Sequence, residues 1–213
     1  MKKSILILCL LSIAFISCKN ESKEEPKNET TEEVADTKKY QIDAAASSIG
    51  WTAYKTTAKT PVSGKFTQLK IDNPKPSDSK HGALEGINFE IPISSFFSDN
   101  DERDNKIKSL FWGIMKDTSI ISGTFKKVHG DDQKGIVYIT IVMNQVPQDV
   151  SFTYTVEGNK INIKGAIMLM NWKVQEAFDS LHKACEALHT GEDGVSKTWQ
   201  EVAINAVAVI KEK

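Results

Sequence analysis

Four side chains that can bind a metal ion recur at helical spacing near the end of the sequence: His182, Cys185, Glu186 and His189. Residues three, four or seven apart lie near one face of an α-helix, and imidazole and thiolate groups are ligands that zinc prefers. The cysteine also continues an apolar stripe, which consists of Val174, Phe178, Leu181, Cys185 and Leu188. A buried cysteine with a histidine on either side explains this pattern without a metal ion, and we favour it over a zinc site.

Other residues that could do chemistry lack the spacing that the chemistry needs. The remaining histidines, His81 and His129, each lie beside a glycine in an expected loop. The acidic residues at positions 99–104 lack the spaced register of a calcium-binding loop, and they suit the first turn of a helix. The sequence contains no G-x-S-x-G nucleophile motif and no glycine-rich phosphate loop. We therefore predict no catalytic residue, no metal site, no cofactor and no enzymatic activity.

Cys18 is the one residue for which the sequence predicts a covalent modification. It follows a basic start and an apolar run, Ile5 to Ile16, that is too short to cross a bilayer, which needs about 20 residues. This order is typical of a secretory signal, and Phe15-Ile16-Ser17-Cys18 resembles the lipobox of bacterial lipoproteins. We predict that residues 1–17 are a signal peptide and that Cys18 is lipidated. An ordinary signal peptide with an incidental cysteine is the alternative.

The segment after Cys18 has the composition of a tether. Residues 19–39 contain seven acidic and five basic residues, one proline and no aromatic residue. Such a segment cannot bury enough apolar surface to offset its ordering entropy, so residues 18–39 are predicted to be a lipidated, disordered tether and residues 40–213 the folded domain. Because Lys19 is not Asp, the usual sorting pattern favours the outer membrane of the bacterial envelope, facing either the periplasm or the surface.

Charge and cysteine content exclude some other classes of protein. The formal net charge is -1 and the isoelectric point is about 6.4, so nothing indicates a nucleic-acid partner. Of the three cysteines, Cys9 would be removed with the signal peptide, Cys18 would be lipidated and Cys185 would be alone. An intramolecular disulfide is therefore not expected.

The folded part consists mostly of runs in which apolar and polar residues alternate. Period-two alternation with turn residues between the runs predicts antiparallel strands that have one apolar and one wet face. Eight such strands can close into a lipocalin-like barrel, although a two-sheet sandwich would give the same pattern. A short helix is expected from Asp101, and a longer helix over residues 171–189 is inserted before the last strand. The predicted strands centre on residues 49–53, 62–66, 87–91, 121–125, 137–143, 150–156, 161–169 and 202–210.

Several patches of sequence occur in an order and spacing that are typical of one family. They are Tyr40-Gln41-Ile42-Asp43, Ser47-Ser48-Ile49-Gly50-Trp51, Val62-Ser63-Gly64-Lys65-Phe66, Arg103-Asp104, Ile107-Lys108-Ser109-Leu110-Phe111-Trp112 and Ile121-Ser122-Gly123-Thr124-Phe125. Together they resemble the YceI-like family. Members of this family often carry histidines where this chain has Ala46 and Lys55, and the helix at 171–189 looks like an insertion, so the identity of a ligand cannot simply be carried across.

The resemblance implies a lipocalin-like barrel whose apolar tunnel holds a polyisoprenoid lipid, or a related molecule such as a quinone, without catalysis. Small residues on the inner rows, such as Ala53, Gly64, Gly165 and Ala206, would leave room for such a chain. A ligand-free surface interaction lipoprotein with a filled barrel is the alternative, and the oligomeric state is open. The residues expected to contact the ligand are Trp51, Ala53, Gly64, Phe66, Phe89, Phe125, Ile139, Ile141, Phe152, Tyr154, Ile163, Gly165, Ile204 and Ala206.

Replacement of the predicted lipidated cysteine tests the anchor. The Cys18→Ala variant should be soluble or unprocessed, because the sulfur that accepts the lipid is gone. Metabolic labelling with a tagged fatty acid measures this directly. Undiminished label on the Cys18→Ala protein would contradict lipidation at this position.

Overall fold

The computed structural model describes residues 39–72, 74–117 and 119–213 of the chain. The predicted signal peptide, the lipidation at Cys18 and the tether lie outside these residues, except for Lys39. Within the described part, no helix has the length and the apolar character that crossing a bilayer requires.

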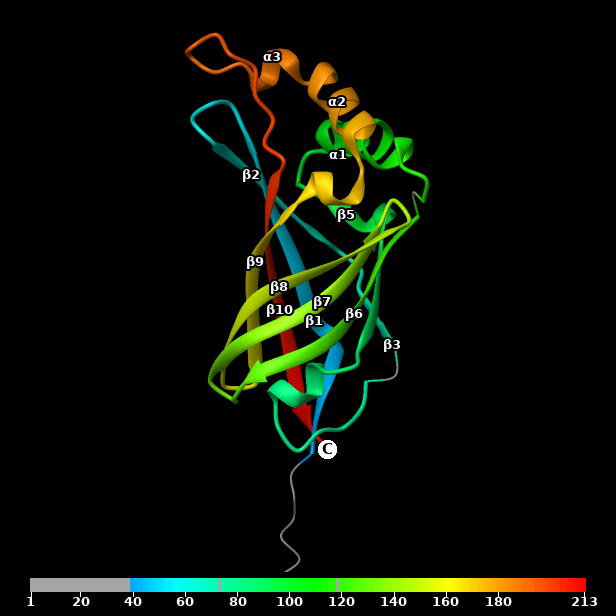
Figure 1. Ribbon diagram of the computed structural model, residues 1–213, viewed down its shortest axis with the longest axis vertical. Coiled ribbons are helices and arrows are strands. Elements are labelled where there is room, and N and C mark those ends of the chain that lie inside the picture. Colours follow the sequence, from blue (N-terminus) through cyan, green and yellow to red (C-terminus); the bar gives the residue numbers. More distant parts are fainter. Residues whose placement is uncertain (1–38, 73, 118) are drawn as a thin grey trace, which may run out of the picture. The chain divides into compact units, whose positions relative to one another are not determined.

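Ten strands form one antiparallel sheet, which curls around an apolar interior (Figure 1). Neighbouring strands in the sheet follow the order β3-β4-β6-β7-β8-β9-β10-β1-β2-β5. Glu157 and Lys160 pair across a tight turn in which Gly158 has a φ of 60°. The strands are β1 (Tyr40–Lys55), β2 (Thr60–Phe66), β3 (Lys70–Asp72), β4 (Asn88–Pro92), β5 (Phe96–Phe97), β6 (Ile120–Gly130), β7 (Lys134–Met143), β8 (Val146–Glu157), β9 (Lys160–Met168) and β10 (Glu201–Glu212).

The prediction of a mainly antiparallel β fold is confirmed, but the prediction of an eight-stranded closed barrel is wrong. The eight predicted runs correspond to the eight longer strands. The two that were missed, β3 and β5, have three and two residues and are too short to show period-two alternation. They are the two edges of the sheet, and they do not pair with each other in the described part of the chain. The sheet is therefore a curled half-barrel with an open seam.

A large bulge bends the longest strand. Residues 44–47 of β1 lie between the pairs Asp43↔Val209 and Ser48↔Val207, so they oppose a single residue of β10. The Ser47 hydroxyl donates to the Asp43 carbonyl oxygen at 2.7 Å and accepts from the Val209 backbone N–H at 3.0 Å. These bonds satisfy backbone groups that the bulge removes from the ladder. Above the bulge β1 pairs with both β10 and β2, from Ile49 onward.

Three helices gather at one end of the sheet, opposite the C-terminus (Figure 1). They are α1 (Asp101–Leu110), α2 (Gln175–Ala184) and α3 (Glu186–His189). The predicted start of α1 is confirmed, because the Asn100 side chain caps the helix by accepting from the Arg103 backbone N–H at 2.8 Å.

The single helix predicted over residues 171–189 is wrong. A 3-10 turn (Leu169–Trp172) comes first, and Lys173 then takes a left-handed conformation with a φ of 56°. Cys185 has φ −110° and ψ 7°, which separates α2 from α3. The first break follows from a tertiary contact, since the fully buried Trp172 indole donates to the Ile141 carbonyl oxygen at 3.0 Å. The turn is thereby fixed to β7.

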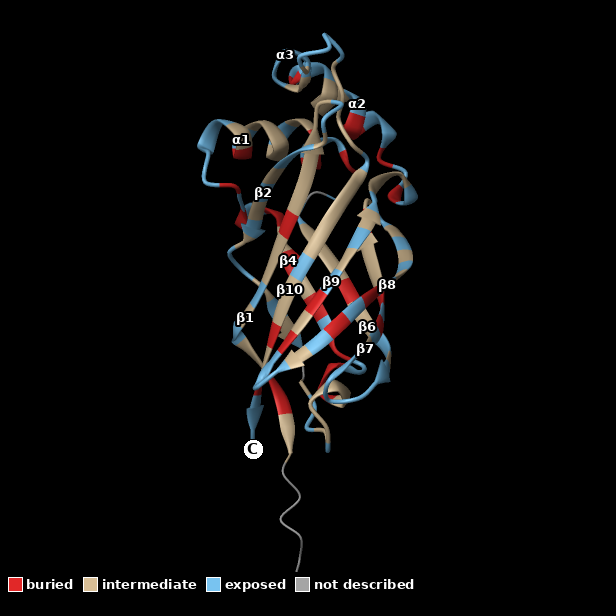
Figure 2. Cartoon of the chain, turned by 90° about the vertical axis from the view of Figure 1, so that its left-hand side faces the viewer, coloured by how far each residue is buried: buried red, intermediate tan, exposed pale blue. Residues whose placement is uncertain are grey.

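Two apolar clusters fill the domain and meet in the middle (Figure 2). One lies inside the curled sheet and includes Leu84, Val137 and Ile161, and the other lies under the helices around Trp172. Both clusters pack against the same five half-buried residues, so the interior is continuous from the sheet to the helices. These shared residues are Phe66, Ile121, Ile141, Val150 and Ile167.

Aromatic rings on the inner face lie over glycines of the neighbouring strand. Phe89 and Gly123 are direct partners across β4 and β6, and a Cβ on Gly123 would lie 2.4 Å from the Phe89 ring. In the same way Trp51 covers Gly64 on β2, and Phe152 covers Gly165 on β9. The idea that Gly64 and Gly165 leave empty room in the lumen is therefore wrong, because an aromatic ring occupies that room.

The packing of the Phe89 ring against Gly123 can be tested by replacing the glycine. Gly123→Ala should lower the free energy of unfolding by about 1–3 kcal/mol, because the added methyl group overpacks against the ring and the Thr140 carbonyl oxygen. Gly50→Ala is a matched strand control, since its Cβ would meet only the side-chain end of Asn205. Urea denaturation of both variants measures the difference. Equal costs for the two substitutions would contradict the packing described here.

Candidate functional site

Three apolar or partly apolar cavities follow one another through the domain. The lower cavity, inside the curled sheet, has a volume of about 80 Å³. The middle cavity, between the sheet and the helices, has about 170 Å³, and the outer cavity, beside α1 and α3, has about 330 Å³. A water molecule needs roughly 10–15 Å³ of such space, so each cavity can admit several atoms of a ligand.

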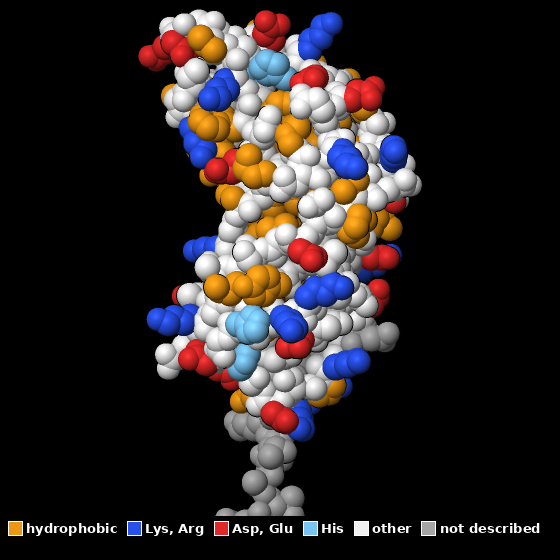
Figure 3. Space-filling view, in the orientation of Figure 1, with side chains coloured by type: hydrophobic (Ala, Val, Ile, Leu, Met, Phe, Trp, Pro, Cys, Tyr) orange, Lys and Arg blue, Asp and Glu red, His pale blue; other side chains and the backbone are white. Residues whose placement is uncertain are grey.

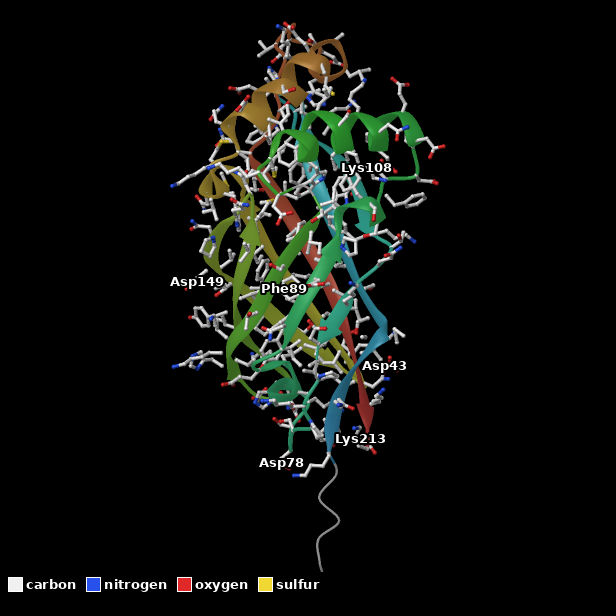
Figure 4. All side chains as sticks on the ribbon, turned by 90° about the vertical axis from the view of Figure 1, so that its right-hand side faces the viewer. Asp43, Asp78, Phe89, Lys108, Asp149 and Lys213 are labelled. Atoms are coloured by element: carbon white, nitrogen blue, oxygen red, sulfur yellow. The ribbon has the colours of Figure 1, made fainter. Side chains whose placement is uncertain are left out.

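Shared lining residues place the three cavities next to one another in a row, which we call the path. The side chains that line both the lower and the middle cavity are Ile49, Phe89, Ile91, Ile141 and Ile204. Figure 4 shows Phe89 near the middle of the curled sheet, at this junction. The side chains that line both the middle and the outer cavity are Trp51, Ala53, Ile107, Leu181 and Thr198.

The lower and middle cavities have almost wholly apolar walls. In the lower cavity the polar side chains are Ser47 and Ser48, which belong to or follow the bulge of β1. In the middle cavity Trp51 stacks on Phe96 with ring centroids 4.7 Å apart, and Phe111 meets Trp112 edge to face at 5.1 Å. Such walls suit a hydrocarbon chain.

The outer cavity is polar and positively charged on one side. Lys55 comes from the end of β1, and Arg103 and Lys106 come from α1. Glu102 is the acidic residue in the same lining, and it lies 3.5 Å from the Lys106 Nζ in an exposed ion pair. The Lys55 Nζ donates to the Leu188 carbonyl oxygen at 3.1 Å, which ties β1 to α3. The path therefore runs from apolar walls to a charged opening.

Thr198 lies between two histidines where the path becomes polar. Its hydroxyl oxygen is 2.8 Å from the Nδ1 atom of His182 and 2.5 Å from the Nδ1 atom of His189. A hydroxyl has a single proton, so it donates to at most one of the two imidazoles, and at least one of them donates its N–H to the hydroxyl oxygen. The pKa of His189 is lowered to about 4, chiefly because the ring is buried, and the nearby Lys55, His182 and Lys106 contribute in the same direction. His189 is therefore neutral at physiological pH.

The helix that was weighed as a metal site is arranged differently from the sequence prediction. Cys185 is buried, as predicted, and burial raises the pKa of its thiol. Leu188, assigned to the same apolar stripe, is 58% exposed, because the interruption at Cys185 turns α3 away from the core. Among the described residues, no group of three or more His, Cys, Asp or Glu side chains could hold a metal ion.

Eleven of the fourteen predicted ligand contacts line the lower, middle or outer cavity, while Gly64, Tyr154 and Gly165 do not. The two glycines lie beneath aromatic rings, and the Tyr154 hydroxyl donates to the Asp131 carbonyl oxygen at 2.9 Å. The binding role of the eleven stays a prediction. They are Trp51, Ala53, Phe66, Phe89, Phe125, Ile139, Ile141, Phe152, Ile163, Ile204 and Ala206.

Sequence reasoning missed the contribution of the helical end. Phe111, Trp112 and Phe178 line the middle cavity, and Lys55 and Lys106 line the outer one. The adjacent aromatic pair at 111–112 was a visible signal for the first group. For the lysines there was no signal, because the cavity that they line forms only when α1 and α3 come together beside β1.

The domain is a curled antiparallel sheet around a row of mostly apolar cavities. It is therefore a hollow β protein with room for a ligand. Residues 40–209 match the model of the YceI-like domain, and the chain therefore belongs to the YceI-like family. No curated protein sequence matches the chain.

Solved structures with this fold are similar at low sequence identity. A polyisoprenoid-binding domain from Saccharophagus degradans, implicated in plant cell wall breakdown, is 14% identical with a TM-score of 0.57, over 82% of this chain and 98% of that one. BcnA from Burkholderia cenocepacia is 13% identical with a TM-score of 0.53, over 80% and 99%. A YceI protein from Campylobacter jejuni is 19% identical with a TM-score of 0.52, over 71% and 85%. At these identities the likeness concerns the fold.

The neutral state of His189 is open to direct measurement. In the folded protein its imidazole should gain a proton only near pH 4, well below the ordinary histidine value of about 6.5. In the unfolded chain the proton is gained earlier, so this residue stabilises the fold above about pH 6.5, and that contribution is lost as the pH falls from there towards 4.

An NMR titration of the histidine side chains, assigned with His189→Asn, checks this behaviour. The asparagine keeps a hydrogen-bonding group near Thr198 but cannot titrate, so stability should fall less steeply with acid in the variant than in the wild type. A His189 midpoint near 6.5 in the folded protein would contradict the environment described here.

Proposed function

We propose that this protein is a membrane-anchored lipid-binding protein, which holds a long-chain isoprenoid or a similar amphiphile inside its curled sheet without chemical conversion. The observation that carries the proposal is the row of adjoining cavities, of which the lower and the middle one have apolar walls. Membership of the YceI-like family and the fold shared with a polyisoprenoid-binding domain support it.

The size of the hydrophobic effect favours a long chain over a short one. Each buried methylene group contributes roughly 0.8 kcal/mol, while association costs about 4–15 kcal/mol in lost freedom. A ligand with few polar contacts must therefore bury on the order of ten or more such groups before it binds tightly. An isoprenoid that reaches from the outer cavity into the lower one meets this requirement.

A filled barrel that serves only as a surface for other proteins is the competing function. It would require bulky side chains to fill the interior and an apolar patch to lie elsewhere on the surface. The volumes of the middle and outer cavities favour a hollow interior. Figure 3 shows hydrophobic side chains on the visible face interspersed with charged ones.

The location that we propose is the bacterial envelope, with Cys18 as the lipid anchor and the outer membrane as the favoured membrane. The support comes from the order of basic, apolar and small residues before Cys18, and from Lys19 after it. A ligand-carrying domain on a charged tether could reach lipids near the membrane that anchors it.

The decisive experiment is extraction of the full-length protein, purified in detergent, with organic solvent. Mass spectrometry of the extract should detect a long-chain isoprenoid, a quinone or a related amphiphile in a fixed ratio to protein. An extract that contains only the lipids of a mock purification would overturn the proposal and favour the filled-barrel alternative.

A cavity-filling substitution tests where the hydrocarbon chain of the ligand binds. Ala53 lines both the middle and the outer cavity, so Ala53→Trp should abolish lipid co-purification. The melting temperature of the delipidated protein should change by only a few degrees, because the indole enters open space rather than a packed core. Delipidated samples are required, since a bound ligand raises apparent stability by mass action.

Thr52→Trp is the matched control on the same strand. The Thr52 hydroxyl bonds to the Ser63 hydroxyl on the outer face of the sheet, so a large side chain there should leave the co-purifying lipid unchanged. Normal lipid content in Ala53→Trp, or an equal loss in both variants, would contradict binding along this path.

A further inference from the structure

The lining of the outer cavity carries an excess of positive charge. Lys55, Arg103 and Lys106 line it together with a single acidic residue, Glu102. The Glu102 side chain is 85% exposed, whereas the Lys106 side chain is 24% exposed, so the lysine lies inside the rim and the carboxylate outside it. An ion pair at 3.5 Å with so exposed a partner is worth little and does not neutralise the lysine.

The positive charge affects the pKa of two groups that line the outer cavity, His189 and Cys185. The pKa of His189 falls mainly because the ring is buried, and Lys55 and Lys106 push it in the same direction. Burial raises the pKa of Cys185, and the same two lysines oppose that shift. Both lysines, one from β1 and one from α1, therefore act on the same space from two sides.

The charged space adjoins the apolar path. Ala53, Ile107 and Leu181 line the outer and the middle cavity alike, so a molecule whose chain lies in the middle cavity has its end beside the lysines. The charged groups at this end are three cations and one carboxylate, and the neutral polar groups come from Tyr54, Asn100, His189 and Thr198. This arrangement suits an anion, because bonds between charged donors and an anionic acceptor are roughly twice as strong as those between neutral groups.

We infer that the outer cavity binds the acidic headgroup, a carboxylate or a phosphate, of the amphiphile whose chain occupies the middle cavity. Lys106 and Lys55 pair with the headgroup, and Arg103 adds to the positive potential. The inference rests on the proposed function, because it concerns the other end of the same ligand.

Pairs of ligands with equal chains and different headgroups test the inference on the delipidated full-length protein. Hexadecanoic acid is compared with hexadecanol, and geranylgeranyl phosphate with geranylgeraniol, by native mass spectrometry or by quenching of tryptophan fluorescence. The acidic member of at least one pair should bind about tenfold more tightly than its alcohol, the effect of one good hydrogen bond to a charged group. The pair that gives the larger ratio identifies the headgroup as carboxylate or phosphate.

Substitutions on one helix then locate the headgroup. Lys106→Met should reduce the ratio between the affinity for the acid and the affinity for its alcohol to about one. Lys106→Arg should restore most of this ratio, because the positive charge returns. Lys108→Met is the matched control, since Lys108 (Figure 4) also belongs to α1, but its Nζ donates to the Ser94 carbonyl oxygen, away from the outer cavity. Lys106 is chosen over Lys55 because Lys55 also holds α3 in place.

The outcomes separate this inference from the proposed function. Alcohols that bind as tightly as the acids in the wild type, or a ratio that Lys106→Met leaves unchanged, would overturn the acidic headgroup while lipid binding stands. Failure of all four ligands to bind, together with an empty organic extract, would overturn the proposed function itself.

Discussion

The inner face of this sheet can carry large aromatic rings only because glycines on the neighbouring strands make room for them. A methyl group at Gly123 would lie 2.4 Å from the Phe89 ring, and at Gly64 it would lie 2.3 Å from the Trp51 ring. Each ring is thereby held close against the sheet instead of projecting across the interior. Phe89 lines the junction of the lower and middle cavities, and Trp51 the junction of the middle and outer ones. The contacts of Phe89 with Gly123 and of Trp51 with Gly64 therefore keep each ring at the boundary between neighbouring cavities.

The helices at one end of the sheet make the two ends of the path chemically different, one apolar and one charged. Trp172 fixes the turn before α2 to β7, and the interruption at Cys185 allows α3 to reach the end of β1. As a result an apolar middle cavity is followed by an outer one that contains cations. A ligand that binds along this path has a preferred orientation, with its chain towards the sheet and its head towards the helices. The helices do more than cover the end of the sheet, because they supply much of the wall and most of the charge.

The sequence predicted features that depend on residues close together in the chain, and it missed features that depend on contacts between residues far apart in the chain. Alternation along single strands identified the eight longer strands and eleven cavity-lining residues, because the side-chain direction in a strand depends on sequence position alone. The strands β3 and β5 were too short to show this signal. The break at Lys173 was missed because a contact between Trp172 and Ile141, distant in sequence, imposes it. The outer cavity could not be foreseen for the same reason, since its lysines lie 51 positions apart in the sequence.

The open seam between β3 and β5 determines where the circumference of the sheet could change. In a closed barrel the circumference is set by the number of strands and their stagger, and it can change only if ladder hydrogen bonds break. Here the ring of ladder hydrogen bonds is interrupted at the seam. The two margins are held instead by the short link of residues 67–69 between β2 and β3, by the Thr67 N–H, which donates to the Ser95 carbonyl oxygen at 2.9 Å, and by the backbone bridge between Tyr40 and Ser77. A wider ligand would therefore strain these few bonds first, and the ladders between the longer strands would stay intact.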